Sequence, residues 1–224
     1  MVCSLSIAMS SPDKLNLQDL RVSYDLDVLL ESNTPSDPVE LFKLWFNDAL
    51  AHQLPEPNAM QLATATPDGT PNVRTVLLKG IDERGFQFFT NYESAKGRDL
   101  AANPRAAACF LWNERHRQAI VRGTVSKLPH EEAQAYFASR PAGHQIGAWA
   151  SAQSQIIPDR AWLDNRAAEF EAKFGSDVPC PPFWGGYTIL PSEIEFWQGR
   201  TSRLHDRLVY VREGGVWVKK RMSP

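Results

Sequence analysis

The stretch from residue 59 to residue 128 most constrains the fold, because it predicts several consecutive strands joined by short turns. The segments between turns are rich in β-branched and aromatic residues, and the turns carry Pro, Gly, Asp and Asn. The predicted strands are 59–65, 73–79, 86–91, 106–112 and 118–128. A run of strands with such short connections favours an antiparallel barrel or sandwich.

Helices are predicted around this block. Asp37 and Pro38 suit the start of a helix whose apolar residues between 41 and 50 share one face. A short helix over 94–103 interrupts the strands and ends before Pro104. Later helical segments are predicted at about 129–140, 146–150 and 158–174.

Strands return after the last helix. They are predicted at 183–190, 194–197, 207–212 and 216–220, and a hairpin turn joins the final pair. Because strands lie on both sides of the helices, residues 36–224 are predicted to form one domain, a β-barrel with flanking helices. Residues 1–35, with scattered Ser, Asp, Asn and Pro, are predicted to be a flexible N-terminal segment.

Composition excludes several classes of protein. The net charge of −2 gives no overall basic field for nucleic acid, so any anion binding must be local. Cys3, Cys109 and Cys180 are far apart and form no C-x-x-C pair, so neither a metal site nor a disulfide framework is expected. Their pattern favours a reducing, cytoplasmic setting. No apolar run is long enough to cross a bilayer, so no membrane partner is expected.

The common nucleotide and hydrolase motifs are also missing from the sequence. It contains no P-loop, no G-x-G-x-x-G after a strand, no H-E-x-x-H and no G-x-S-x-G. The candidate chemistry therefore depends on cations and amides near strand ends.

One cluster of cations lies near the C-terminal end, in Arg203-Leu204-His205-Asp206-Arg207. As a strand, this segment would place Arg203, His205 and Arg207 on one face. Two guanidiniums and an imidazole together indicate a site that binds an anion and handles a proton. The polar outer face of an edge strand is the alternative. The aromatic residues at 194–197 favour a pocket mouth.

Other cations lie in the block of strands. Arg74 and Lys79 are five residues apart, so they face opposite sides unless the strand twists or bulges, or lies where two subunits meet. Thr90 and Lys96 flank a strand-to-helix junction, where free N–H groups of residues 93–96 are expected to cradle a phosphate. Each cation alone is typical of a protein surface, but together they indicate a phosphorylated ligand.

A series of short motifs then gives a family resemblance. They are RTVLLK at 74–79, FFTN at 88–91, RQ at 117–118, SRP at 139–141, QIGAW at 145–149, PFWGG at 182–186, and FWQG with RLHDR within 196–207. In this order and spacing, from about residue 21 to residue 224, they resemble the pyridoxine/pyridoxamine 5′-phosphate oxidase family.

The resemblance implies an antiparallel split β-barrel and a homodimer with FMN at the subunit interface. It also implies oxidation of pyridoxine 5′-phosphate and pyridoxamine 5′-phosphate to pyridoxal 5′-phosphate. O₂ is the implied electron acceptor, giving H₂O₂, and the amine substrate releases NH₃.

The resemblance also implies roles for individual residues. The FMN-binding residues would be Arg74, Thr75, Val76, Leu77, Leu78, Lys79, Phe89, Thr90, Lys96, Gln118, Gln153, Ser154, Trp197 and Arg207. The substrate-binding residues would be Arg21, Tyr24, Lys79, Tyr136, Arg140, His144, Arg203, Leu204 and His205. Arg203 and His205 are the expected catalytic pair, and residues 21–24 would fold over the site as a lid.

The chain departs from the family pattern at three positions. Ala95 replaces a common Arg, which predicts weaker FMN binding. His144 stands where Ser is frequent, and adds bulk and a pH-dependent charge. Phe89 replaces a Tyr of some members, which has no consequence if the backbone makes the contact.

Two other functions are alternatives. One is a related split-barrel flavin oxidase acting on another aromatic substrate, such as a reduced phenazine precursor. The other is a non-catalytic binder of FMN or pyridoxal phosphate.

Overall fold

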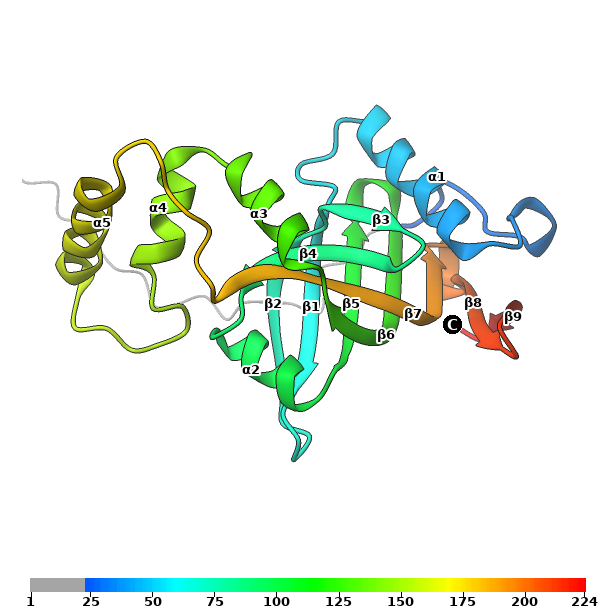
Figure 1. Ribbon diagram of the computed structural model, residues 1–224. Helices are drawn as coiled ribbons and strands as arrows, with labels where there is room; N and C mark the ends of the chain where they lie inside the picture. The colour runs from blue at the N-terminus through cyan, green and yellow to red at the C-terminus, as the bar shows by residue number, and fades with distance from the viewer. Residues whose placement is uncertain (1–22) are drawn as a thin grey trace, which may run out of the picture.

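The computed structural model describes residues 23–224. Within this part of the chain, strands pair antiparallel throughout and curl into the barrel at the centre of Figure 1. The strands are β1 (Ala59–Ala65), β2 (Pro71–Leu77), β3 (Gly80–Asp82), β4 (Gly85–Asn91), β5 (Arg105–Trp112), β6 (Arg117–Lys127), β7 (Trp184–Gln198), β8 (Asp206–Glu213) and β9 (Val216–Met222). Their order is β2-β1-β5-β6-β7-β4-β3, with β8 pairing β7 and β9.

Strand β7 corrects the prediction of two separate strands at 183–190 and 194–197. It runs unbroken from Trp184 to Gln198, and its first half pairs with β4 whereas its second half pairs with β8. The ladder with β6 shifts register next to Gly123, where a Cβ atom would overlap the carbonyl oxygen of Leu190. The register skips Ser192, next to Pro191, and this bulge lets β7 continue past the proline.

The predicted helices are present with revised ends. They are α1 (Pro38–Ala51), α2 (Ala95–Ala102), α3 (His130–Ala138), α4 (Ala142–Ala150) and α5 (Arg160–Phe174). Asp37 caps α1 by accepting a hydrogen bond of 2.8 Å from the Val39 amide, and Ser94 caps α2 by accepting one of 3.2 Å from Gly97. None of the described helices meets the length and hydropathy that a membrane span requires.

The core has two parts. Phe42 of α1 is fully buried in the barrel, edge-on to Phe86 at 4.9 Å and to Phe110 at 4.7 Å. A second cluster lies under α3, α4 and α5, where Phe137 packs edge-on against Trp184 at 5.1 Å. These three helices lie to one side of the barrel in Figure 1.

The N-terminal segment is described only from residue 23. Its described part lies along β8 and β9: Leu29 is buried, the Tyr210 hydroxyl donates to the Pro35 carbonyl, and Lys219 donates to the Thr34 carbonyl. Arg21 lies outside the described residues. The role of residues 21–24 as a lid stays a prediction.

Candidate active site

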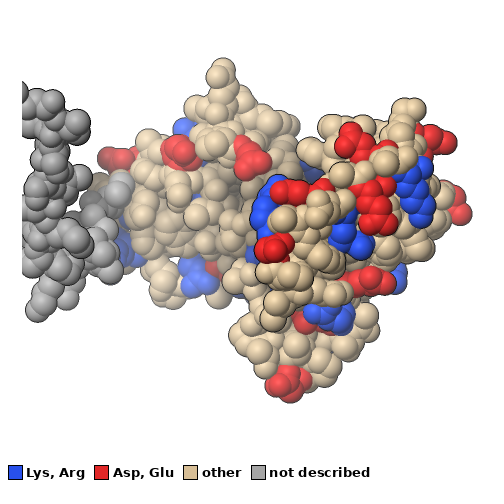
Figure 2. All heavy atoms as spheres, turned by 90° about the vertical axis from the view of Figure 1, so that its left-hand side faces the viewer, with Lys and Arg blue, Asp and Glu red and all other residues tan. Residues whose placement is uncertain are grey.

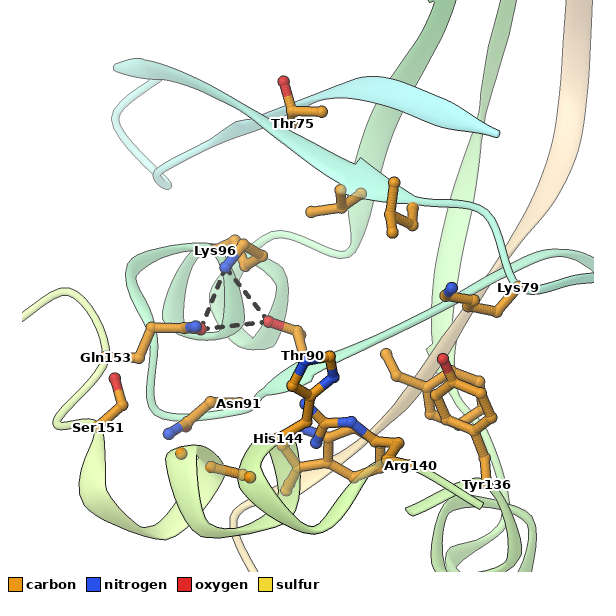
Figure 3. Close-up of a pocket in the computed structure, with 17 residues that line it drawn as sticks. Thr75, Lys79, Thr90, Asn91, Lys96, Tyr136, Arg140, His144, Ser151 and Gln153 are labelled. Atoms are coloured by element: carbon orange, nitrogen blue, oxygen red, sulfur yellow. Dashed lines mark hydrogen bonds between the residues drawn. The ribbon is translucent and has the colours of Figure 1, made fainter. Parts of the chain in front are cut away.

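A cavity of about 700 Å³ opens between β2, β4 and the helices α3 and α4 (Figure 3). It gathers many of the residues that the sequence singled out. They are Thr75, Val76, Leu77, Lys79, Phe89, Thr90, Lys96, Tyr136, Arg140, His144 and Gln153. Asn91, Ser151 and Trp184 also line it, although sequence reasoning gave them no role.

One end of the cavity holds a buried ammonium group. Lys96 is only 8% exposed, and its Nζ donates to Thr90 Oγ1 at 3.2 Å and to Gln153 Oε1 at 3.3 Å, the dashed triangle of Figure 3. Burial, together with the charge of Arg74, lowers the pKa of Lys96. Both oxygen partners are neutral, so this end of the cavity favours an anionic ligand.

The other end is built on aromatic rings. The Arg140 guanidinium stacks on Trp184 at 4.9 Å, and Tyr136 stacks on Phe89 with ring centroids 4.1 Å apart. Burial lowers the pKa of Arg140, and its buried Nη1 has no hydrogen-bond partner among residues 23–224. Lys79 and His144 complete this end of the cavity (Figure 3). An orphaned guanidinium donor of this kind fits an oxyanion.

The signal for Trp184 was present in the sequence. It belongs to the PFWGG motif at 182–186 and opens a strand after a Pro-rich connector. Its ring lies 5.5 Å from Phe89, nearly parallel, and supports Arg140. An aromatic residue at a strand start beside predicted cations is therefore a usable indicator of a pocket wall.

Two residues predicted to hold the cofactor point elsewhere in this chain. Arg74 donates to the Leu62 carbonyl at 3.1 Å and to Thr64 Oγ1 at 2.6 Å, and lies 3.7 Å from Asp99. Leu78 is buried in the barrel core. Lys79 lines the cavity and Arg74 does not, but β2 ends at Leu77, so the alternation expected for a strand over 73–79 does not extend to Lys79.

Two of the backbone amides predicted to bind a phosphate at the start of α2 already donate hydrogen bonds within the protein. The Glu93 amide donates to Asn91 Oδ1 at 2.6 Å, and the Ser94 amide donates to the Asn91 carbonyl at 3.2 Å. The prediction of free N–H groups from 93 to 96 is therefore wrong for its first two residues, because Asn91 forms a local turn there. Of the four predicted amides, those of Ala95 and Lys96 in the first turn of α2 remain as candidates.

A second and smaller cavity, of about 200 Å³, gathers other predicted residues. Tyr24, Gln118 and Trp197 line it, and Tyr24 lies edge-on to His116 at 4.7 Å. His205 lies against it, with its ring 4.6 Å from Trp197 and 5.7 Å from Tyr24. The described linings of the two cavities share no residue. Within one chain, the predicted site residues are therefore distributed over two separate cavities.

The segment from 203 to 207 corrects a prediction. Arg203 ends a 3₁₀ turn over Thr201–Arg203, and β8 begins only at Asp206. Strand alternation therefore does not place Arg203, His205 and Arg207 on one face. Arg207 instead donates to Glu195 Oε1 at 2.6 Å and to the Ser223 carbonyl at 3.0 Å.

Two further predicted residues lie outside both cavities. Leu204 is 71% exposed in the loop before β8, and Ser154 follows Gln153 with a left-handed φ of 67°. Neither is in the described lining of the large cavity. Their roles stay predictions.

The charge pattern outside the cavity is mixed. On the face shown in Figure 2, basic and acidic side chains of the described residues are interspersed. This face therefore presents no large field of one sign, in keeping with the net charge of −2.

Fold and site together define a split-barrel protein with a cation-lined, aromatic-walled cavity. Comparison with protein families makes this specific. Residues 46–174 match the family model described as pyridoxamine 5′-phosphate oxidase, and residues 184–224 match the one described as pyridoxine 5′-phosphate oxidase C-terminal dimerisation region. The chain belongs to the pyridoxamine 5′-phosphate oxidase family, which confirms the resemblance found in the sequence.

Individual relatives support the same assignment. The pyridoxine/pyridoxamine 5′-phosphate oxidase of Cupriavidus taiwanensis is 56% identical, over 93% of this chain and 99% of its own. That of Pseudomonas paraeruginosa is 55% identical over the same shares. The crystal structure of PhzG from Burkholderia lata, in complex with tetrahydrophenazine-1-carboxylic acid, is 36% identical with a TM-score of 0.84, and covers 89% of this chain and 100% of that one.

Proposed function

We propose that this protein oxidises pyridoxine 5′-phosphate and pyridoxamine 5′-phosphate to pyridoxal 5′-phosphate with FMN as cofactor. O₂ accepts the electrons and becomes H₂O₂, and the amine substrate releases NH₃. The observation that carries the proposal is one cavity with separate cationic groups at its two ends, Lys96 and Arg140. Two phosphorylated ligands in one site require this arrangement, because each phosphate brings a charge of about −1.5 to −2.

The Lys96 end is assigned to the FMN phosphate. Its buried ammonium has neutral oxygens of Thr90, Gln153 and Ser94 as partners, so an anion there gains a charge-assisted hydrogen bond. The residues present therefore fit the cofactor. FMN supplies the two-electron acceptor, and the protein supplies position and a dry, shaped site.

The Arg140 end is assigned to the substrate phosphate. The planar guanidinium is fixed on Trp184, and its orphaned Nη1 is available to donate. Lys79, Tyr136 and His144 add donors around the same end. Arginine suits this task because its fork geometry makes two hydrogen bonds to a phosphate.

A homodimer completes the site in this proposal, with FMN at the subunit interface. Gln118, Trp197 and the loop with Arg203 and His205 lie outside the large cavity, so the partner's copies would supply that wall. Support comes from the match of residues 184–224 to a dimerisation region. Exposed apolar side chains add to it, with Val73 69% exposed and Leu111 50% exposed on the barrel.

Within each subunit we propose one domain over 36–224. The segment of residues 21–24 is its lid, and Tyr24 already lies against Trp197. The thiols of Cys109 and Cys180 are free, which supports a cytoplasmic location.

Steady-state turnover tests the proposal. Purified protein with added FMN should convert pyridoxine 5′-phosphate to pyridoxal 5′-phosphate, with one H₂O₂ formed for each product. Pyridoxine without its phosphate is the matched control and should be a poor substrate. Equal turnover of the two compounds would contradict the proposal that Arg140 binds the substrate phosphate.

The second candidate is oxidation of a phosphate-free reduced aromatic compound. It is favoured by the PhzG structure, which holds tetrahydrophenazine-1-carboxylic acid in a fold matching this one at a TM-score of 0.84. The orphaned Arg140 donor favours a phosphorylated substrate instead. Direct competition between pyridoxine 5′-phosphate and a reduced phenazine carboxylate in one assay separates the two candidates. A non-catalytic binder would turn over neither.

A further inference from the structure

The loop between β7 and β8 carries Arg203 and His205 in a constrained conformation. Ser202 and Arg203 both have left-handed backbones, with φ of 56° and 61°. Residues with a Cβ atom rarely adopt this conformation, so contacts elsewhere must hold it. Those contacts are made by Arg200 and Asp206, at the two ends of the loop.

Arg200 and Asp206 close the loop on itself. Arg200 Nη1 donates to Asp206 Oδ2 at 2.8 Å, and Asp206 is 9% exposed at the start of β8. The same carboxylate accepts from the Leu29 amide at 3.1 Å and from Arg221 Nη1 at 2.7 Å. Asp206 therefore anchors the loop to the N-terminal segment and to β9, so its position is set by three separate parts of the chain.

A second contact from Arg200 reaches His205 directly. The backbone amide of Arg200 donates to His205 Nδ1 at 3.1 Å. A backbone N–H is only a donor, so Nδ1 must carry a lone pair, and the neutral ring holds its proton on Nε2. Around the ring are Trp197, Tyr24 and the guanidinium of Arg203. Burial and the charge of Arg203 lower the pKa of His205, which favours the neutral ring.

We propose that Arg200 and Asp206 are positioning residues that hold His205 as the neutral Nε2–H tautomer. His205 then donates a hydrogen bond to an acceptor on the bound aromatic ring and does not remove a proton from it. The identity of that ring rests on the proposed function, whereas the tautomer is a property of the chain alone. In this proposal the His205 imidazole is a fixed hydrogen-bond donor, whereas the sequence indicated a group that transfers a proton.

Nuclear magnetic resonance of the protein reconstituted with FMN tests the tautomer without any substrate. With ¹⁵N-labelled histidine at a pH near 8, His205 should show a lone-pair-bearing Nδ1 and a protonated Nε2. The resonance is assigned by its loss in His205→Gln. A protonated Nδ1 in the wild-type protein would overturn the proposal, even if pyridoxine 5′-phosphate is oxidised as expected. Failure of turnover with the Nε2–H tautomer intact would count against the proposed function only.

Variants test the positioning role. Arg200→Ala keeps the backbone amide but releases the loop from Asp206, so His205 should show a mixture of tautomers. The kcat/KM should fall about tenfold, the size of one lost charged hydrogen bond, with the FMN Kd unchanged. Arg212→Ala, an exposed arginine on β8, is the matched control and should change neither quantity.

Asp206→Asn gives an independent variant if Arg200→Ala folds poorly. It keeps the size of the side chain and removes the charge that anchors Arg200. It should shift the His205 resonances in the same direction as Arg200→Ala. A folded variant of either kind with a wild-type tautomer population would contradict the positioning role.

Discussion

Lys96 on α2 and Gln153 after α4 meet across the candidate site, where the lysine Nζ donates to the glutamine amide oxygen at 3.3 Å. Thr90 of β4 contacts both side chains, also at distances near 3.3 Å. The contact connects the helical side of the molecule to the barrel. It also leaves a buried positive charge with only neutral partners, which is the physical basis for placing a phosphate there.

Removing that charge should weaken cofactor binding. In Lys96→Met we expect the FMN Kd to rise about 10- to 100-fold, because a charge-assisted hydrogen bond contributes about 1.5–3 kcal/mol. Titration of FMN fluorescence against the apoprotein measures the effect. Lys220→Met, an exposed lysine paired with Glu213, is the matched control. A wild-type Kd in Lys96→Met would exclude Lys96 from the cofactor site.

An arginine at position 95, where the family commonly has one, should strengthen FMN binding. Ala95 is the first residue of α2 and precedes Lys96, which lines the cavity. Ala95→Arg should tighten FMN binding by about tenfold, through one added charged hydrogen bond. Ala102→Arg, at the other end of the same helix, controls for net charge. Equal effects of the two substitutions would mean that the gain is nonspecific electrostatics.

The assignment of Arg140 to the substrate phosphate predicts a split in the kinetic constants. Arg140→Lys keeps the charge but loses the planar fork and the stacking on Trp184. The KM for pyridoxine 5′-phosphate should rise about tenfold or more, with the FMN Kd unchanged. Initial-rate measurements give the first quantity and fluorescence titration the second. If the FMN Kd changed and the KM did not, the assignments of the two ends of the cavity to cofactor and substrate phosphate would have to be exchanged.

Asp206 predicts a pH dependence of stability. Hydrogen bonds from the Leu29 amide, Arg221 and Arg200 lower the pKa of Asp206 below its ordinary value of 3.8, against the opposing effect of burial. The stabilisation is therefore fully present above that ordinary value and is lost as pH falls through the lower folded pKa. Urea unfolding between about pH 5 and pH 3 should show a steeper loss of stability in the wild type than in Asp206→Asn. Parallel curves would show that Asp206 has an unshifted pKa.

The local elements were predictable because the signals for them are local. The Asp37 cap, the glycine turn between β8 and β9 and the apolar strands of the barrel each depend on a few neighbouring residues. The sequence divided β7 in two because a proline usually ends a strand, but a bulge at Ser192 of β7, opposite Gly123 of β6, lets the strand continue past Pro191. That accommodation is a property of two strands far apart in the chain.

The candidate site was predictable in its residues but not in its geometry. The cations of the large cavity follow from the motifs, and the family comparison confirms the family to which those motifs belong. The loop with Arg203 and His205 was misread as a strand, because R-x-H-x-R alternates as a strand does. Ser202 and Arg203 adopt left-handed backbone conformations, which sequence patterns predict mainly at glycine or asparagine. Asp206 fixes that loop through Arg200, six residues away, and through the Leu29 amide, which is 177 residues away in the sequence.

The central claim is that one site holds a flavin and a phosphorylated pyridine together, and anaerobic reduction tests it most directly. Purified protein with bound FMN should be yellow, and pyridoxine 5′-phosphate added without O₂ should bleach the flavin absorbance at one equivalent per site. Admission of O₂ should restore the colour with release of H₂O₂. Flavin that stays yellow after the substrate is added, although FMN is bound, would contradict the account.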